Sequence, residues 1–189
     1  MAVTVRDSEP HEAETAFEIQ KAASLAALAH VFPPDVYPYP DDAIEERWRR
    51  FPGRVFLAER DGRAVGVAAV EGEWLHGLYV VPDEWGTGVA GQLHAHAVEA
   101  IAAAHDRAKL WCLESNHRAR RFYEKHAWRE NGDTRRRRVP TAPARRRLLA
   151  RAPSHVVVGS AVAQRLKRRV VQRDAVAPER VARGQQALA

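Results

Sequence analysis

The sequence predicts an α/β fold of the α+β kind, with a mixed, mostly antiparallel sheet and helices on both of its faces. Two apolar, β-branched segments, 54–59 and 64–70, flank Asp61-Gly62, a dipeptide that strongly favours a hairpin turn. A tight connection leads into a third such segment, 74–81. A glycine-rich turn and an amphipathic helical pattern follow, which is typical of an antiparallel meander that continues into a strand–helix–strand unit.

The elements before the hairpin are predicted from caps and prolines. Residues 3–6 are expected to form a short strand. A helix is expected from a cap at Ser8, with Pro10 in its first turn, to about His30. Four prolines then break residues 31–40 into an irregular loop.

Two further helices have recognisable starts. Asp42 and Glu45 have the spacing of a capping box, so a short helix is expected to begin there and to end before Pro52. Asn116 is expected to cap a later helix whose inner face includes Tyr123.

Two more strands are expected in the second half of the chain. Residues 108–113 predict a strand that returns beside 74–81 in parallel, because a strand–helix–strand crossover of this length does so naturally. Residues 128–130 are expected to start a further strand.

The turn after residue 81 has the features of an anion-binding site. Pro82 ends the strand, and Gly86, Gly88 and Gly91 let the backbone approach a ligand closely. Unpaired N–H groups and the positive end of a helix dipole then point at whatever lies there. We interpret that anion as the pyrophosphate of a coenzyme.

Two other interpretations of this turn stay open. Residues 86–91 match GxGxxG, the dinucleotide fingerprint, and Glu114 could serve as its ribose-binding acid. In a dinucleotide fold, however, the strand runs almost straight into the first glycine, whereas residues 82–85 intervene here after a hairpin. The second alternative is a tight turn without a ligand.

Charge divides unevenly along the 189 residues. Residues 1–134 hold 15 Lys and Arg against 22 Asp and Glu, a net charge of −7. Residues 135–189 hold 15 against 2, a net charge of +13, so the overall +6 describes the second segment. The sequence predicts one domain over 1–134 and an Arg-rich tail, disordered or atypical, over 135–189.

Cysteine usage and hydropathy favour a protein of the reducing cytoplasm. Cys112 is the only cysteine and is expected to be an ordinary core thiol. No apolar segment is long enough to span a bilayer, and no signal peptide or metal-ligand cluster is expected. The oligomeric state stays open.

A strand at 78–80, a glycine turn at 86–90 and a block at 113–128 follow a hairpin in this order and at this separation. Together they resemble the GNAT superfamily of acetyl-CoA-dependent N-acetyltransferases, over roughly residues 3–131. The resemblance implies a GNAT-like fold whose closing strands are missing or altered, because an alternating pattern is hard to find after residue 135. Residues 154–159 are one candidate strand.

The resemblance implies an enzyme that binds acetyl-CoA where two parallel strands splay apart. The pantetheine arm would pair with the backbone of Leu78, Tyr79 and Val80, and a bulge near the first two would aim an N–H at the thioester oxygen. Asn116 would hold the pantetheine, and Tyr123 would be the general acid, unless it is a core tyrosine with a satisfied hydroxyl. The pyrophosphate would lie on the amides of Gly86, Thr87, Gly88, Val89, Ala90 and Gly91.

Three residues depart from the family pattern. Trp85 stands where Arg or Gln is usual, Ala90 where a second glycine is common, and Ala127 where a glycine ends the last helix. A positive φ at Ala127 would cost about 1 kcal/mol. None of the three removes a reacting group.

Transfer from a thioester to an amine needs a base, because the free amine is mostly protonated at neutral pH. His76 is the candidate, since it lies two residues before Leu78 on the same strand and titrates in the useful range. The alternatives are a half-buried histidine without such a role, and Glu71, Glu73 or a water chain as the base.

Two groups of side chains have roles that stay open. Three arginines of the last helix either reach the coenzyme phosphate or form a solvated face: Arg118, Arg120 and Arg121. Three aromatic residues of the proline-rich loop either line an acceptor pocket or anchor the loop on the sheet: Phe32, Tyr37 and Tyr39.

The sequence therefore predicts direct transfer of an acetyl group from acetyl-CoA to a primary amine, of a small molecule or of a protein, in a ternary complex. Two alternatives from other classes stay open. One is a sensor that binds the coenzyme without turnover. The other is a nucleic-acid-associated protein that acts through the basic tail.

Overall fold

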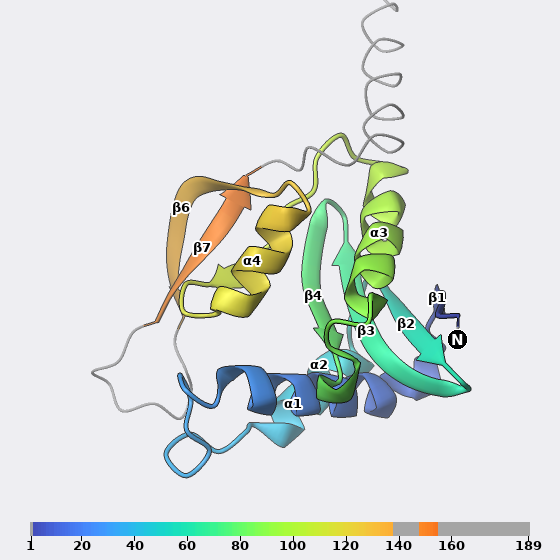
Figure 1. Cartoon of the computed structure of the whole chain (residues 1–189), viewed down its shortest axis with the longest axis horizontal. Coiled ribbons are helices and arrows are strands. Elements are labelled where there is room, and N and C mark those ends of the chain that lie inside the picture. The colour runs from blue at the N-terminus through green and yellow to red at the C-terminus, as the bar shows by residue number, and fades with distance from the viewer. Residues whose placement is uncertain (1, 138–147, 155–189) are drawn as a thin grey trace, which may run out of the picture.

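The computed structural model of the chain describes residues 2–137 and 148–154, and the side chains of residues 2–131. Its N-terminal strands form a sheet with helices on both faces. A second, smaller sheet lies next to the last helix, α4 (His117–Lys125), on the side away from the first sheet (Figure 1). The predicted α/β class with a mostly antiparallel sheet is confirmed. No helix in the described part of the chain is long and apolar enough to cross a membrane.

The first sheet has the order β1-β2-β3-β4, with antiparallel neighbours throughout. Asp61 and Gly62 at the hairpin tip both have positive φ, 54° and 76°, as a two-residue turn that matches the twist of the strands requires. The predicted hairpin is confirmed. The strands are β1 (Thr4–Asp7), β2 (Arg54–Arg60), β3 (Arg63–Glu71) and β4 (Trp74–Val80).

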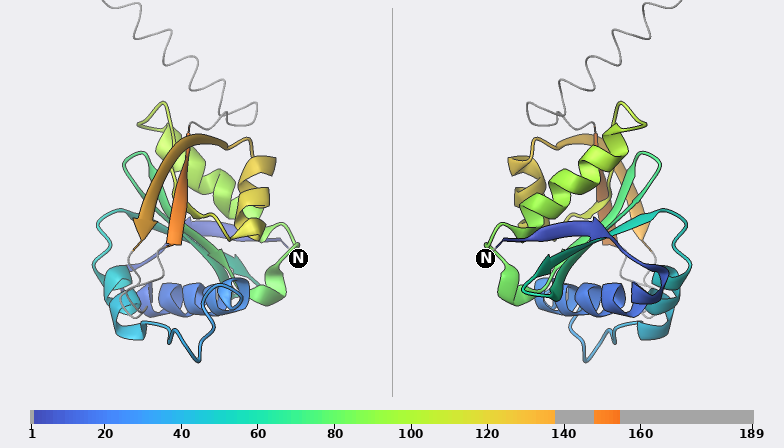
Figure 2. Two further views of the ribbon diagram at one scale, coloured as in Figure 1. Left: turned by 90° about the vertical axis from the view of Figure 1, so that its left-hand side faces the viewer. Right: turned by 90° about the vertical axis from the view of Figure 1, so that its right-hand side faces the viewer.

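Helices cover both faces of this sheet, with α1 and α2 on one side and α3 on the other (Figure 2). Phe56 and Leu57 are successive residues of β2 and both have no exposed surface, so the sheet is buried on its two faces. The helices are α1 (Ala13–Leu28), α2 (Asp41–Arg49) and α3 (Val89–Ala102), and the 3₁₀ turns are η1 (Pro10–Glu12) and η2 (Pro82–Glu84).

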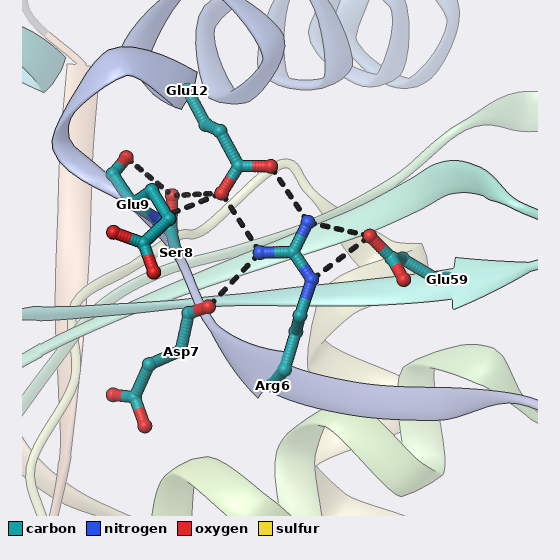
Figure 3. A network of polar contacts seen from close by, with 6 residues as sticks. All are labelled: Arg6, Asp7, Ser8, Glu9, Glu12 and Glu59. Atoms are coloured by element: carbon teal, nitrogen blue, oxygen red, sulfur yellow. Dashed lines mark hydrogen bonds and ion pairs between the residues drawn. The ribbon is translucent and has the colours of Figure 1, made fainter.

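Arg6 ties β1 to η1 and β2 (Figure 3). Its guanidinium donates to the Glu12 carboxylate at 2.6 and 2.8 Å and to Glu59 Oε1 at 2.5 and 2.9 Å. The Glu9 amide donates to Glu12 Oε2 at 2.7 Å. The Glu12 carboxylate therefore accepts the hydrogen bond of a backbone N–H group at the start of η1, whose N-cap is Glu9. The cap predicted at Ser8 is wrong.

The capping box predicted for the second helix is also wrong. α2 begins at Asp41, directly after Pro40, so Asp42 and Glu45 lie inside the helix. Its start is instead favoured by two acidic residues in the first turn, which interact with the positive end of the helix dipole. The loop between α1 and α2 is irregular, as its prolines predict.

The second sheet has the order β5-β7-β6 and antiparallel pairing. Its strands are β5 (Cys112–Leu113), β6 (Arg129–Arg137) and β7 (Leu148–Ser154). The strand predicted to start at residues 128–130 is confirmed. Residues 135–137 and 148–154 are strand, which differs from the disorder expected of them, and β6 runs across the predicted boundary at 134/135.

The remainder of the predicted tail lies outside the described residues, and with it all of the candidate strand at 154–159 except Ser154, the last residue of β7. The division into a domain at 1–134 and a tail at 135–189 stays a prediction.

The two sheets meet at one short parallel contact and then diverge. The Leu75 amide donates to Lys109 O, and the Lys109 amide to Glu73 O, both at 2.8 Å. Beyond this point β4 pairs with β3, and β5 pairs with β7. The strand predicted over 108–113 is therefore parallel to β4 at Lys109, but regular strand is confined to β5.

Candidate functional site

A cavity of about 440 Å³ lies between the second half of β4 and α4. Its walls come from α1, from the second half of β4, from the turn after η2 with the start of α3, and from α4. It collects most of the cofactor and catalytic residues expected from the sequence: Leu78, Tyr79, Val80, Gly86, Gly88, Ala90, Gly91, Asn116 and Tyr123. Three expected site residues do not line it: Thr87, Val89 and His76.

The turn before α3 presents unpaired backbone amides. Gly86 and Gly88 have φ of 85° and 94°, a conformation that residues with a Cβ rarely adopt. Within the described residues, the N–H groups of Gly86, Gly88, Val89 and Ala90 donate no hydrogen bond. Three of these residues, Gly86, Gly88 and Ala90, also line the cavity, so their amides at the positive end of α3 are available to an anion.

The other two amides of this stretch are occupied. The Gly91 amide donates to Gly88 O at 3.1 Å and the Thr87 amide to Glu84 O at 3.4 Å. Val89 has no exposed surface, so its side chain anchors the first turn of α3 in the core. Fewer amides are therefore available to the pyrophosphate than the six expected from residues 86 to 91.

The outer edge of β4 faces the cavity. The Val81 amide donates to Val65 O at 3.0 Å, so residues 79 and 81 turn their amides toward β3, whereas Leu78 and Val80 turn theirs away. Within the described residues, no strand pairs with β4 on that side beyond Leu75. An extended ligand arm can therefore hydrogen-bond there as an added strand would.

The bulge in β4 lies at His76, not near Leu78 and Tyr79 as expected. Val70 pairs with Leu75 and Ala69 pairs with Gly77, which leaves His76 as the extra residue. A Cβ at Gly77 would lie 2.6 Å from the Tyr79 ring, so glycine is needed beside the bulge.

His76 and the two alternative bases lie outside the cavity. The His76 ring packs edge-on against Phe51, and its Nε2 lies 3.3 Å from Glu71 Oε2. Glu73 is paired with Lys109 at 2.6 Å. The structure does not bring His76 and Tyr123 into one cavity, and the role of His76 as base stays a prediction.

Tyr123 lines the cavity from α4, with its ring packed against Phe122, Trp128 and His94. Burial raises the pKa of its phenol well above the ordinary value, which keeps the hydroxyl protonated. The hydroxyl makes no hydrogen bond to the rest of the described chain. A protonated, unpaired hydroxyl in a cavity wall is suited to donate a proton to a ligand.

Asn116 caps α4 as predicted, and its Oδ1 accepts from the Ala119 amide at 3.1 Å. The side-chain amide nitrogen is left for a ligand. Ala127, just after this helix, has a φ of 64°, so the strain expected at this departure from glycine is present.

Trp85 and Arg118 form a pair that sequence reasoning did not connect. The Arg118 guanidinium lies 4.0 Å from the centroid of the Trp85 ring, and both line the cavity. The Trp85 indole nitrogen also donates to Val80 O at 2.7 Å. The Arg118 guanidinium thus lies beside Trp85, the position at which the family pattern usually has Arg or Gln.

The other two arginines of α4 and the three aromatic residues of the proline-rich loop do not line the cavity. Arg120 is bound to Glu130 at 2.5 Å, and neither it nor Arg121 lines the cavity. Among the loop aromatics, Phe32 packs edge-on against Tyr37, and Tyr39 packs on Phe17 of α1. None of the three lines the cavity; Tyr39 anchors the loop on α1, whereas the contact of Phe32 with Tyr37 lies within the loop.

His94 lies behind Tyr123 and was missed. Burial, and the nearby His126, lower its pKa from 6.5 to about 4, so its imidazole is neutral. The Trp128 indole donates to His94 Nε2 at 2.8 Å, which requires that nitrogen to be unprotonated. A signal existed, because His94 lies between Leu93 and Val98 on the apolar face of the helical pattern.

Comparison with known proteins gives a consistent result. The model of the "Acetyltransferase (GNAT) family" matches residues 21–128. An uncharacterised N-acetyltransferase of Archaeoglobus fulgidus is 37% identical over 36% of this chain and 55% of its own length, so the chain spans about half of that relative.

The solved structures that resemble the fold include two acetyltransferases. A GCN5-related N-acetyltransferase of Rhodopseudomonas palustris has a TM-score of 0.66 at 18% identity, and the match covers 83% of this chain and 97% of that one. The acetyltransferase YncA of Salmonella typhimurium, solved with acetyl-CoA, has a TM-score of 0.57 at 15% identity, covering 85% and 97%.

Proposed function

Because the chain belongs to the acetyltransferase (GNAT) family, we propose that it transfers an acetyl group from acetyl-CoA to a primary amine. The acceptor class is an amine of a small molecule or of a protein. Transfer is direct, from bound donor to bound acceptor, without a covalent enzyme intermediate.

One observation carries the proposal. A single cavity combines the unpaired amides of Gly86, Gly88 and Ala90 at the start of α3, an edge of β4 that pairs with no described strand beyond Leu75, and the hydroxyl of Tyr123. These groups suit a diphosphate, an extended amide-bearing arm and a thiolate leaving group, in that order along one ligand. The residues present therefore fit coenzyme A.

Each residue has a distinct role in this proposal. Gly86, Gly88 and Ala90 bind the diphosphate through their amides, and Asn116 holds the pantetheine arm. The coenzyme supplies an acetyl group activated as a thioester. The Leu78 amide, which points away from β3, donates to the carbonyl oxygen and so favours attack on it.

Two proton transfers complete the reaction. Tyr123, which burial keeps protonated by raising its pKa, passes its proton to the departing thiolate through a hydrogen bond and regains a proton from solvent. The acceptor amine loses a proton to His76, assisted by Glu71, or to water that enters from the side of the bulge. The exposed position of His76 suits exchange of that proton with solvent.

The proposal is tested with the full chain in two steps. Acetyl-CoA should raise the melting temperature, because a ligand that binds only the folded state stabilises it by mass action. Release of free thiol is then measured across a panel of amines that includes polyamines, amino acids and peptide N-termini. Binding without thiol release from any amine would contradict transfer, and the absence of binding would contradict the site.

A further inference from the structure

The cavity contains a carboxylate that works against the proposed ligand. Glu84 is the one acidic residue among the described residues of the wall. It lies at the end of η2, directly before the turn whose amides are unpaired. A negative charge there repels a diphosphate, and carboxylates are themselves favoured at helix N-termini.

Arg60 engages this carboxylate from the neighbouring hairpin. Its Nη1 lies 2.5 Å from Glu84 Oε2, and the two side chains are only 21% and 14% exposed. Arg60 Nε is buried without a hydrogen-bond partner in the described part of the chain. The guanidinium therefore bears an unsatisfied donor in order to hold Glu84, which is the kind of cost found at functional positions.

Thr87 fixes the same carboxylate from the other side. Its hydroxyl lies 2.8 Å from both Glu84 Oε2 and Glu84 O. Turning Glu84 toward the amides would break these contacts and the ion pair together.

We propose that Arg60 is a positioning residue of the coenzyme site, which neutralises Glu84 and keeps its carboxylate from occupying the amides meant for the diphosphate. The inference rests on the proposed coenzyme site and adds a requirement to it. The Glu84 carboxylate could otherwise occupy the amides that the diphosphate needs, and the ion pair with Arg60 holds it away from them.

A neighbouring ion pair supplies a matched control. Arg63 Nη2 lies 2.7 Å from Asp83 Oδ2, one residue from Glu84 and across the same hairpin-to-turn contact. Both side chains are 60% exposed and neither lines the cavity. Loss of Arg63 removes a cation of equal charge from the same region without freeing a carboxylate in the wall.

The test compares coenzyme A affinity by calorimetry for the full chain and its variants. Arg60→Met should weaken binding about tenfold, because an uncompensated charge is left beside the diphosphate. The double variant Arg60→Met/Glu84→Gln should bind within about threefold of wild type. Arg63→Met should change the affinity by less than about twofold.

The pattern of the variants separates the outcomes. Weak binding of the double variant, or an equal loss in Arg63→Met, would overturn the inference, since Arg60 would then act directly on the ligand or on the fold. Unchanged binding of Arg60→Met would overturn it too. If Arg60→Met does not fold by circular dichroism, Glu84→Gln decides: it should bind as tightly as wild type or more tightly, and weaker binding overturns the inference. Failure of the wild-type protein to bind coenzyme A would instead overturn the proposed function, and this inference with it.

Discussion

Tyr123 shows how one side chain gains a chemical role from its surroundings. A phenol is a weak acid in water, and burial against Phe122 and Trp128 makes it weaker still. It therefore remains protonated at any pH at which the protein works. Such a group always carries a hydrogen to donate to the departing thiolate, although the raised pKa makes that proton harder to release, and it cannot serve as a base.

Replacing Tyr123 by Phe should lower kcat about a hundredfold and leave coenzyme affinity within about threefold, because only the proton donor is removed. Steady-state kinetics and calorimetry measure the two quantities. Tyr37→Phe is the control, since Tyr37 is buried in the loop and does not line the cavity. A parallel loss of turnover and affinity in Tyr123→Phe would assign this tyrosine a structural role only.

His94 should make the protein sensitive to mild acid. Its pKa is 6.5 when exposed and about 4 in the folded protein, so the unfolded chain binds more protons between these values. The contribution of neutral His94 to the free energy of unfolding is therefore complete above pH 6.5 and is lost as the pH falls toward 4. Between pH 7 and pH 5 the loss from this residue is on the order of 2 kcal/mol.

Urea unfolding at pH 7 and pH 5 measures this effect. His94→Gln keeps an acceptor for the Trp128 indole and should reduce the loss of stability between the two pH values. His117→Gln, at the exposed start of α4, should not. An identical pH dependence in wild type and His94→Gln would show that His94 does not titrate on unfolding.

At the scale of elements, ion pairs add to apolar packing at the start of the chain. Arg6 joins β1, η1 and β2 through Glu12 and Glu59 (Figure 3). β1 is a short edge strand with no fully buried residue, so these ion pairs add to its backbone pairing with β2 and to the packing of Val5 on the core.

The network predicts a second pH effect, at lower pH. Hydrogen bonds from Arg6, and then from the Glu9 amide, lower the pKa of Glu12 from 4.5 to about 2. Its contribution is complete above pH 4.5 and is lost as the pH falls toward 2. Because the Arg6 side chain is 40% exposed, solvent screening limits the contribution to roughly 0.5–1 kcal/mol.

Glu12→Gln should therefore destabilise the protein at pH 6 by about that amount and by less at pH 3, as measured by urea unfolding. Glu14→Gln, at an exposed position in the first turn of α1, serves as the control and should have little effect at either pH. A difference that stays constant between pH 6 and pH 3 would refute the assigned pKa shift.

At the scale of the whole molecule, the predicted boundary at residue 134 can be tested directly. β6 crosses it, and β7 pairs with both β5 and β6. Truncation after residue 134 should therefore remove the second sheet and destabilise α4, which packs beside it. Truncation after residue 154 keeps every described strand.

The expected outcome is a cooperative melting transition for 1–154 and the loss of that transition, or a markedly lower one, for 1–134. The full chain is the reference for both. Equal stability of the two truncated chains would show that 1–134 is a complete domain.

What the sequence could predict depended on how local each signal was. The Asp61-Gly62 hairpin, the glycine turn and the Asn116 cap are specified by a few adjacent residues, and each was found. The closing strands were expected to be missing or altered, because β6 is rich in arginine and has no alternating apolar pattern. Pairing with β7 overrides its composition.

The candidate site divides in the same way. Residues of β4 and the turn follow from a contiguous motif, whereas the contact of Trp85 with Arg118 joins positions 33 apart in sequence and needs the fold. The bulge at His76 shifted the strand by one residue, which no pattern in the sequence marks. The side of the strand on which His76 lies could not be read from alternation for that reason.

The divergence of β4 and β5 has a mechanical consequence. Beyond Lys109 the two sheets share no backbone contact within the described chain, yet the cavity between them is walled by α1 and β4 on one side and by α4 on the other. A ligand that fills the cavity contacts α1 and β4 on one side and α4 on the other. The buried contact of His94 with Trp128 already joins α3 to the residue before β6, and a bound ligand adds contacts to α1, β4 and α4 together, so the loaded protein should unfold in a single cooperative step.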